Sequence, residues 1–199
     1  MKQIEELLAE YEIDYLYHMT YVDNLGSILL RGLLSRQQTC SQNLTYTDIS
    51  DQEVQKRRSC KIVRGIPLHG YVPLYFNPRN PMLFVRKNLQ SQIAILGIDP
   101  LVLLQPHSVF SDGNAACSNT VFYKDLSSLS RLNWKIIRQS IWYDQPDGKR
   151  IKCAEVLVYP QIAVRNILSV FCYSDEMVAD IKKLRQDHLR IEVNRNLYF

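Results

Sequence analysis

The chain has 199 residues, of which 46% are hydrophobic and 22% charged, with a formal net charge of +4. These fractions exclude a disordered or fibrous class, and the length suits one hydrophobic core, so we expect a single domain over residues 1–199. No stretch approaches the roughly 20 apolar residues of a membrane span, and the opening MKQIEELLAEYEI lacks the pattern of a secretion signal. Five cysteines without a C-x-x-C pair favour a reducing cytoplasm over a zinc site or a disulfide framework.

The first third of the chain predicts a helix, a strand and a second helix, in that order. IEELLAEY (4–11) has apolar residues at helical spacing, and YLYHMT (15–20) alternates as a strand does. DNLGSILLRG (23–32) combines capping residues, a helical apolar spacing and a terminal glycine. Residues 36–56 are polar and lack sustained periodicity until Ser50 and Glu53, which fit a capping box. They predict a mobile loop, then a short helix that starts at Ser50 and carries the arginines of EVQKRR (53–58).

The remainder alternates strands and helices, which predicts a mixed α+β fold. The expected strands are GYVPLYF (70–76), IAILGID (93–99), AEVLVYP (154–160), ILSVFCYS (167–174) and RIEVNRNLYF (190–199). The expected helices are LSSLSRLNWKIIRQSIW (126–142), as one helix or a pair, and DEMVADIKKLRQDH (175–188).

Common catalytic signatures are absent from the sequence. It contains no Gly-rich phosphate loop, no H-E-x-x-H and no G-x-S-x-G. The four histidines, His18, His69, His107 and His188, show no metal-ligand spacing. We therefore predict no metal site and disfavour metal-dependent hydrolysis and P-loop chemistry.

Three local features could carry chemistry, and each has a plainer interpretation. His18 and Thr20 share one face at a strand end, where they could reach a ligand or simply be structural. Arg57 and Arg58 could hold a pyrophosphate, but a basic last helical turn is also common without any ligand. Glu155 shares a strand face with Leu157, so it is either at an exposed edge or a functional acid.

The segment YVPLYFNPRNPMLF (71–84) interrupts a strand with three prolines. Because proline donates no backbone hydrogen bond, Pro73, Pro78 and Pro81 should confine this strand to a sheet edge or end it near Asn77. The pattern is typical of a cleft wall that ends in a rigid turn.

Four stretches in this order, YLYHMTYVDNLGSILLRGLLS, EVQKRR, YVPLYFNPRNPML and AEVLVY, resemble the DarT family of DNA ADP-ribosyltransferase toxins. The third stretch is the most specific. The resemblance implies a mono-ADP-ribosyltransferase-like fold with two central β-sheets around an NAD cleft and flanking helices. It also implies transfer of ADP-ribose from NAD, a co-substrate used without a metal, to a base in single-stranded DNA. The implied base is thymidine, with guanosine as the alternative, and the implied partner is an antitoxin macrodomain protein of the DarG kind.

The resemblance further implies roles for individual residues. Glu155 falls on the family's catalytic glutamate and Arg58 on its functional arginine. A carboxylate can stabilise the oxocarbenium-like ribose that forms when the nicotinamide bond breaks. A guanidinium is a poor base, so we assign Arg58 to positioning and charge stabilisation rather than to proton abstraction. The implied NAD-binding residues are His18, Met19, Thr20, Ser27, Ser35, Arg58, Tyr75 and Met82.

Several aromatic and basic residues could belong either to the cleft or to the core. Phe76, Arg79 and the 114–153 segment could line the cleft or the path of the substrate strand, and several of these side chains must belong to the core. The candidates in that segment are Phe122, Tyr123, Trp134, Trp142 and Tyr143 for stacking, and Lys124, Arg131 and Lys135 for phosphates. The NAD site does not reveal the acceptor, so transfer to RNA or protein remains an alternative, as does a catalytically silent nucleic-acid-binding or NAD-binding module.

Overall fold

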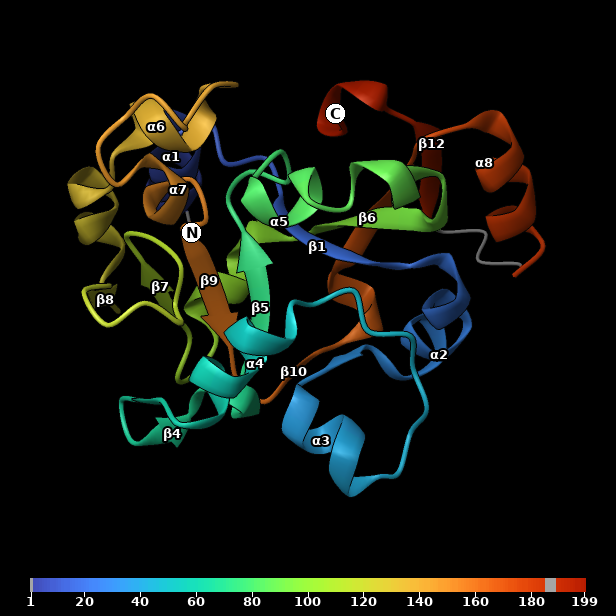
Figure 1. Cartoon of the computed structure of the whole chain (residues 1–199), viewed down its shortest axis with the longest axis horizontal. Helices are drawn as coiled ribbons and strands as arrows, with labels where there is room; N and C mark the ends of the chain where they lie inside the picture. Colours follow the sequence, from blue (N-terminus) through green and yellow to red (C-terminus); the bar gives the residue numbers. More distant parts are fainter. Residues whose placement is uncertain (1, 185–188) are drawn as a thin grey trace.

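The computed structural model describes residues 2–184 and 189–199, and it is built on one eight-stranded mixed sheet flanked by short helices (Figure 1). The strand order is β12-β11-β6-β1-β5-β9-β7-β8. These strands are β1 (Leu16–Tyr21), β5 (Val72–Tyr75), β6 (Ile93–Ile98), β7 (Val109–Ser111), β8 (Phe122–Tyr123), β9 (Glu155–Val158), β11 (Ile167–Cys172) and β12 (Arg190–Val193). Two small sheets pair β2 (Leu33–Leu34) with β10 (Gln161–Ile162), and β3 (Ile62–Val63) with β4 (Ile66–Pro67). The predicted α+β class is confirmed.

The helices are short and lie around the sheet (Figure 1). The α-helices are α1 (Lys2–Glu10), α2 (Leu25–Arg31), α3 (Arg36–Ser41), α4 (Gln52–Ser59), α5 (Pro81–Phe84), α6 (Trp134–Arg138), α7 (Gly148–Ile151) and α8 (Asp175–Lys182). Single 3-10 turns cover Val22–Asn24, Leu68–Gly70, Lys87–Gln92, Pro100–Leu104, Leu126–Arg131, Val164–Asn166 and Arg195–Leu197. No helix within the described ranges is both long and apolar enough to cross a membrane.

The sheet is nearly divided between β1 and β5. Strand β1 pairs with β6 along its whole length, but it pairs with β5 only at Tyr17 and Tyr75. The expected two central sheets are therefore present as two four-stranded halves of one continuous sheet. Proline explains the division, because Pro73 has no N–H to donate and β5 ends at Tyr75, just before the Asn77–Pro81 corner.

The position of β5 differs from the expectation that the prolines of residues 71–84 confine this strand to a sheet edge. It is not an outer strand, because β9 pairs with it on the other side from Val72 to Tyr75. The alternative prediction, that the prolines end the strand near Asn77, is correct. The cleft wall that we expected from residues 71–84 thus lies in the middle of the sheet, where the pairing between β1 and β5 is nearly interrupted.

The core occupies both faces of the sheet. All six residues of β6 are buried, and its side chains alternate between two clusters. Leu96 and Ile98 belong to the larger cluster, whereas Ile93 and Ile95 belong to a second cluster that includes Tyr198. The Tyr198 hydroxyl donates to Ile93 O and Phe171 O and so fixes the C-terminal segment against the sheet.

Several predicted elements are shorter than expected. The stretch 126–142 forms a 3-10 turn and α6 rather than long helices, and 190–199 forms a four-residue strand followed by a turn. Helix α4 begins after Asp51, whose side chain accepts from Val54 N, and not after Ser50. The end of the helix expected over 175–188, with His188, lies outside the described residues.

Candidate active site

A cavity of about 800 Å³ opens where the two halves of the sheet meet. Its size is toward the upper end of the range for small-molecule sites. Strands β1, β5 and β9, helices α2 and α4 and the loop 44–51 all contribute to its wall. The wall includes His18, Met19, Thr20, Ser27, Arg58, Tyr75, Met82 and Glu155, which are all but one of the residues predicted for the site.

A buried ion pair joins α4 to β9 at the cavity wall. Arg58 Nη1 contacts Glu155 Oε2 at 2.9 Å, and the two residues are 6% and 0% exposed. The other carboxylate oxygen, Oε1, accepts from Ala115 N at 2.8 Å. The structure thus answers the open question about Glu155, which is a buried, doubly hydrogen-bonded carboxylate and not part of an exposed edge.

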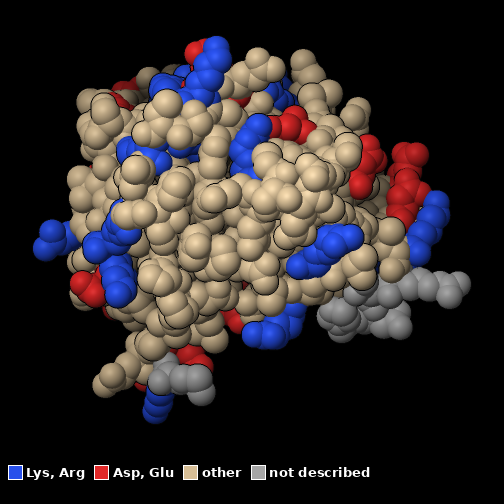
Figure 2. All heavy atoms as spheres, turned by 90° about the horizontal axis from the view of Figure 1, so that it is seen from below, with Lys and Arg blue, Asp and Glu red and all other residues tan. Residues whose placement is uncertain are grey.

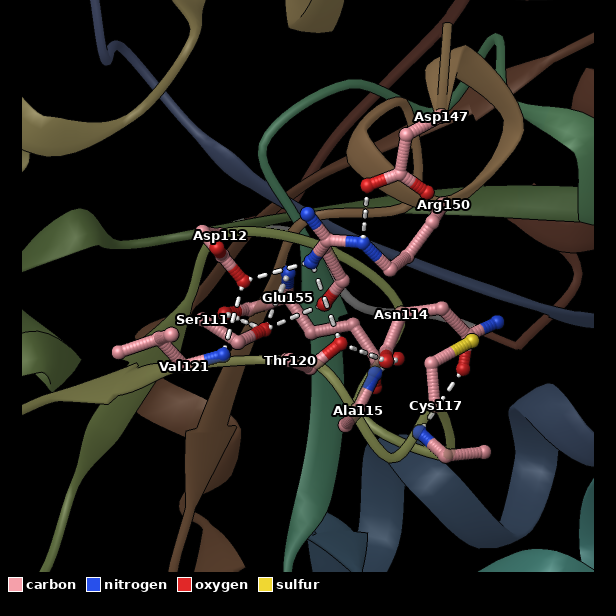
Figure 3. Close-up of polar contacts among 12 residues, drawn as sticks. Ser111, Asp112, Asn114, Ala115, Cys117, Thr120, Val121, Asp147, Arg150 and Glu155 are labelled. Carbon is pink, nitrogen blue, oxygen red and sulfur yellow. Dashed lines mark hydrogen bonds and ion pairs between the residues drawn. The ribbon is translucent and has the colours of Figure 1, made fainter.

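The loop that carries Ala115 is held in place by a second charge network (Figure 3). Arg150 Nη1 donates to Asp112 Oδ1 at 2.7 Å, and Arg150 Nε donates to Asp147 Oδ2 at 2.6 Å. A side chain at Gly113 would place its Cβ only 2.5 Å from Arg150 Nη1. Arg150 therefore fastens the loop between β7 and β8 to α7, and the loop in turn presents its backbone N–H to the glutamate.

On the opposite wall, β1 presents His18 and Thr20. His18 Nδ1 lies 3.0 Å from Pro73 O, and because a carbonyl can only accept, Nδ1 carries the proton. Burial lowers the pKa of His18, so the ring is neutral and Nε2 has a free lone pair. Thr20 Oγ1 accepts from Asn24 Nδ2 at 2.9 Å, so its own hydroxyl proton is available to a ligand.

The polar loop after α3 forms a third part of the wall. Asn24 makes two hydrogen bonds to the backbone of Thr47, Asp48 pairs with Arg36 at 2.7 Å, and Arg86 Nε donates to Ile49 O. The mobile loop that we expected is thus tethered at several points. These contacts place residues 44–51 directly on the cavity.

Tyr75 lies directly across from Glu155 in the pairing of β5 with β9. Burial, and then the negative charge of Glu155, raise the pKa of Tyr75 well above its ordinary value. Burial likewise raises the pKa of the Cys153 thiol, which also borders the cavity. Both side chains therefore remain protonated and neutral at physiological pH.

The comparisons with known proteins agree with this geometry. Residues 17–199 match the family model for "ssDNA thymidine ADP-ribosyltransferase, DarT". The chain belongs to the DarT family. It is 31% identical over 180 residues to a DNA ADP-ribosyl transferase from Thermus sp. (strain 2.9), covering 85% of this chain and 86% of that protein.

One further relative and two solved structures extend the comparison with DarT proteins. A DNA ADP-ribosyl transferase-DNA ADP-ribosyl glycohydrolase fusion protein from Thermosipho africanus is 30% identical over 173 residues, which cover 84% of this chain and 45% of the fusion. The structure of Thermus sp. 2.9 DarT in complex with ADP-ribosylated ssDNA superposes with a TM-score of 0.85 at 28% identity, covering 94% of this chain and 97% of that one. The complex of the same DarT with NAD+ gives a TM-score of 0.79 at 27% identity, covering 94% and 98%.

Not every residue that the DarT resemblance implied lies at the cavity. Ser35 is buried and caps α3 by accepting from Gln38 N, and it is not among the cavity-lining residues. Phe76 packs against Phe110 and Trp134 in the core rather than lining the cleft. The guanidinium of Arg79 lies over the ring of Phe199 and not in the cavity wall.

The aromatic candidates of the 114–153 segment separate into core and surface residues. Trp134 stacks on Tyr11 and donates through Nε1 to Leu129 O, and Tyr123 packs on Phe110. Tyr143 is 80% exposed. Most of the expected stacking residues in this DarT chain are therefore structural.

Sequence reasoning missed Arg150 and the backbone N–H of Ala115. The turn-forming Ser-Asp-Gly-Asn at 111–114 signals a tight loop before the glutamate, but sequence spacing does not show that its N–H groups face a side chain about 40 positions later. Within the described residues, no group of three His, Cys, Asp or Glu side chains is arranged to hold a metal ion.

Proposed function

We propose that this chain transfers ADP-ribose from NAD to a base in single-stranded DNA. Thymidine is the acceptor that the family description names, and guanosine is the alternative. The observation that supports this most directly is the buried Arg58–Glu155 pair in the wall of a dinucleotide-sized cavity. Thermus sp. 2.9 DarT, which shares this fold, has been captured with NAD+ and with ADP-ribosylated ssDNA.

The site residues divide naturally between the two substrates. We assign His18, Met19, Thr20, Ser27 and Tyr75 to the NAD side of the cavity, because they share its wall with the loop 44–51. The neutral His18 ring offers a lone pair at Nε2, and Thr20 offers a hydroxyl proton. Together these groups can hold a carboxamide or ribose hydroxyl by one acceptor and one donor. Met82 and Arg58 lie on the same wall and complete our assignment.

Transfer requires the ribose–nicotinamide bond to break, and its electron pair leaves with nicotinamide. The ribose that remains is oxocarbenium-like, and we assign Glu155 to stabilise its positive charge near the 2-hydroxyl. A nitrogen of the acceptor base then forms the new bond to the same carbon. Arg58 fixes the carboxylate in place and stabilises negative charge on the pyrophosphate or on the acceptor base, whose nitrogen gives its proton to solvent as the new bond forms.

The biological setting follows from the relatives. In the Thermosipho africanus fusion protein, a transferase and a DNA ADP-ribosyl glycohydrolase are parts of one chain. We infer that the present chain is the toxin of a toxin-antitoxin pair whose macrodomain partner removes the modification. We also infer a cytoplasmic location and a single domain, supported by five free thiols and by one sheet that runs through the chain.

The decisive experiment measures the intact mass of single-stranded oligonucleotides after incubation with the protein and NAD. Strands with thymidine or guanosine as the sole candidate base are compared with matched RNA and with a Glu155→Gln control. Gain of one ADP-ribose on DNA, absent in the control, is the expected result. Gain on RNA or on a protein instead would favour the other acceptors, and NAD binding without any transfer would indicate a silent module.

A further inference from the structure

Three aromatic rings form a cluster beside the cavity that the chemistry above does not use. Phe84, Trp142 and Phe199 meet pairwise in edge-to-face contacts, with centroid separations of 5.6, 5.2 and 5.7 Å. They come from α5, from the segment between α6 and α7, and from the chain end. Phe84 is 42% exposed, and Tyr143, next to Trp142, is 80% exposed. Trp142 itself is only 7% exposed, so Phe84 and Tyr143 offer the exposed rings among these four residues, which we call the aromatic platform.

Two buried polar side chains hold the platform in position. Gln90, 4% exposed, donates to Phe199 O at 2.8 Å and accepts from Phe199 N. Lys152, 1% exposed, donates to Ile137 O and Gln139 O, and so fixes the segment that leads into Trp142. The fold thus positions Phe199 and Trp142, and Phe84 through its contacts with them, which lowers the entropy cost of stacking on Phe84.

Positive charge surrounds the platform. The guanidinium of Arg79 lies 4.9 Å from the Phe199 centroid, and Lys87 Nζ lies 5.0 Å from that of Phe84. Among the described residues, Arg79, Lys87 and Lys152 form no ion pair with a carboxylate, and Arg79 Nε has no acceptor. Burial and the charge of Arg79 lower the pKa of Lys152 to about 8. Lys152 is buried and loses charge readily, so Arg79 and Lys87 are the cations at this corner that favour an anionic ligand.

The platform adjoins the mouth of the cavity. Met82 lines the cavity and lies in the same single helical turn as Phe84. Val85, 62% exposed, and Lys149 also line it. In Figure 1 the C-terminus lies at the upper edge and α5 lies below it, and the Phe84 and Phe199 rings join the two segments. By contrast, Figure 2 shows Lys and Arg scattered among uncharged residues over another face, without one continuous basic patch.

We propose that the aromatic platform binds the bases that flank the acceptor nucleotide in a single strand, with Arg79 and Lys87 contacting its phosphates. This inference rests on the proposed function. Exposed aromatic faces with nearby cations are the usual means of holding a single strand, since every base has a face to stack. A strand passing from the cavity mouth over Phe84 and Tyr143 would keep its acceptor base at Glu155 while neighbouring bases stack outside.

Binding without NAD tests the platform apart from catalysis. The affinity of the wild-type protein for a fluorescent 12-nucleotide strand is measured by anisotropy. Because one stacked base contributes about 1–3 kcal/mol, Phe84→Ala and Tyr143→Ala should each weaken binding by roughly 5- to 150-fold. Tyr143→Phe should retain affinity, and Lys87→Ala should reduce the slope of log affinity against log salt by about one. Leu168→Ala, an exposed apolar change on β11, is the matched control and should have no effect.

A crosslinking experiment locates the strand directly. Oligonucleotides with 5-iodouracil one to three positions from the acceptor are irradiated with the protein, and mass spectrometry should place the crosslinks at Phe84 or Tyr143. Unchanged affinity in both alanine variants, or crosslinks elsewhere, would overturn the platform. Loss of binding to a macrodomain partner with unchanged DNA affinity would make it a protein interface instead. Failure of the proposed function has a different signature, namely no transfer by the wild-type protein to any strand.

Discussion

Arg58 and Glu155 contact each other at 2.9 Å although 97 positions of sequence separate them. The arginine comes from the last turn of α4, and the glutamate is the first residue of β9. Both are buried, so each neutralises a charge that would otherwise be costly to remove from water. Variants of either residue therefore affect folding as well as transfer, and tests of their catalytic role must separate the two effects.

Glu155→Gln should abolish transfer and lower stability less than Glu155→Ala, because the amide keeps the shape of the side chain and its oxygen can accept from Ala115 N–H, although its NH2 group then faces Arg58 and the guanidinium loses its counter-charge. Glu155→Ala should abolish transfer too, but it leaves the Arg58 charge buried and unpaired, at a cost of about 3–5 kcal/mol. Urea denaturation and oligonucleotide mass report the two effects. Detectable ADP-ribosylation by Glu155→Gln would contradict the role we assign to the carboxylate.

Arg58→Lys should keep the protein folded and lower transfer by roughly 100-fold or more. An ammonium can pair with Glu155, but it lacks the planar fork that contacts two partners at once. Arg58→Ala should be inactive and less stable by about 3–5 kcal/mol, since it leaves a buried carboxylate without its partner. Turnover by Arg58→Lys at the wild-type rate would rule out a geometric requirement for the guanidinium.

Arg150→Met should lower kcat by roughly 10- to 100-fold while the protein stays folded. The change frees the loop that presents Ala115 N–H to Glu155, so the carboxylate is less well oriented. Asp112→Asn should act through the same loop. In a double-mutant cycle the two effects on kcat should therefore be strongly non-additive. Fully additive effects would mean that Arg150 and Asp112 act independently of each other.

Lys152 should make stability depend on pH in the alkaline range. Burial lowers its pKa to about 8 in the folded protein, against about 10.4 when unfolded. Between these values the unfolded state holds the extra proton, so the free energy of unfolding rises with pH. Neutral Lys152 keeps two N–H groups for its two carbonyl partners. Relative to Lys152→Met, the wild-type protein should gain stability in urea between pH 7.5 and 9.5; a constant difference would contradict the lowered pKa.

The sequence predicted the strands near the site well. The pattern of Y-H-x-T and of A-E-V-L-V placed His18 and Glu155 on strands, and both line the cavity. Ser27 and Met82 followed from motif position and also lie in the wall. The two strand predictions, at His18 and Glu155, succeeded because a strand fixes side-chain direction with a period of two, and sequence displays that period directly.

Other features could not be read from the sequence because they depend on contacts across the fold. Ser35 has the hydroxyl that a ligand site would use, but its local position at a helix start makes it a cap. Phe76 and Arg79 have side chains suited to a cleft, yet one packs in the core and the other lies over Phe199. The residue type determines which interactions a side chain can make. Its neighbours in the folded protein determine which of these interactions it does make.

The single pairing of Tyr17 with Tyr75 determines how the cleft can respond to its ligands. His18 and Thr20 belong to one half of the sheet and Glu155 to the other, and among the described residues the ladder between β1 and β5 consists of this one pair. Ladder hydrogen bonds are what resist shear and splaying of neighbouring strands, and here they are nearly missing. We therefore expect the spacing between the two sides of the cavity to change without breaking the strand pairing within either half, so that NAD and an acceptor base can occupy the site together.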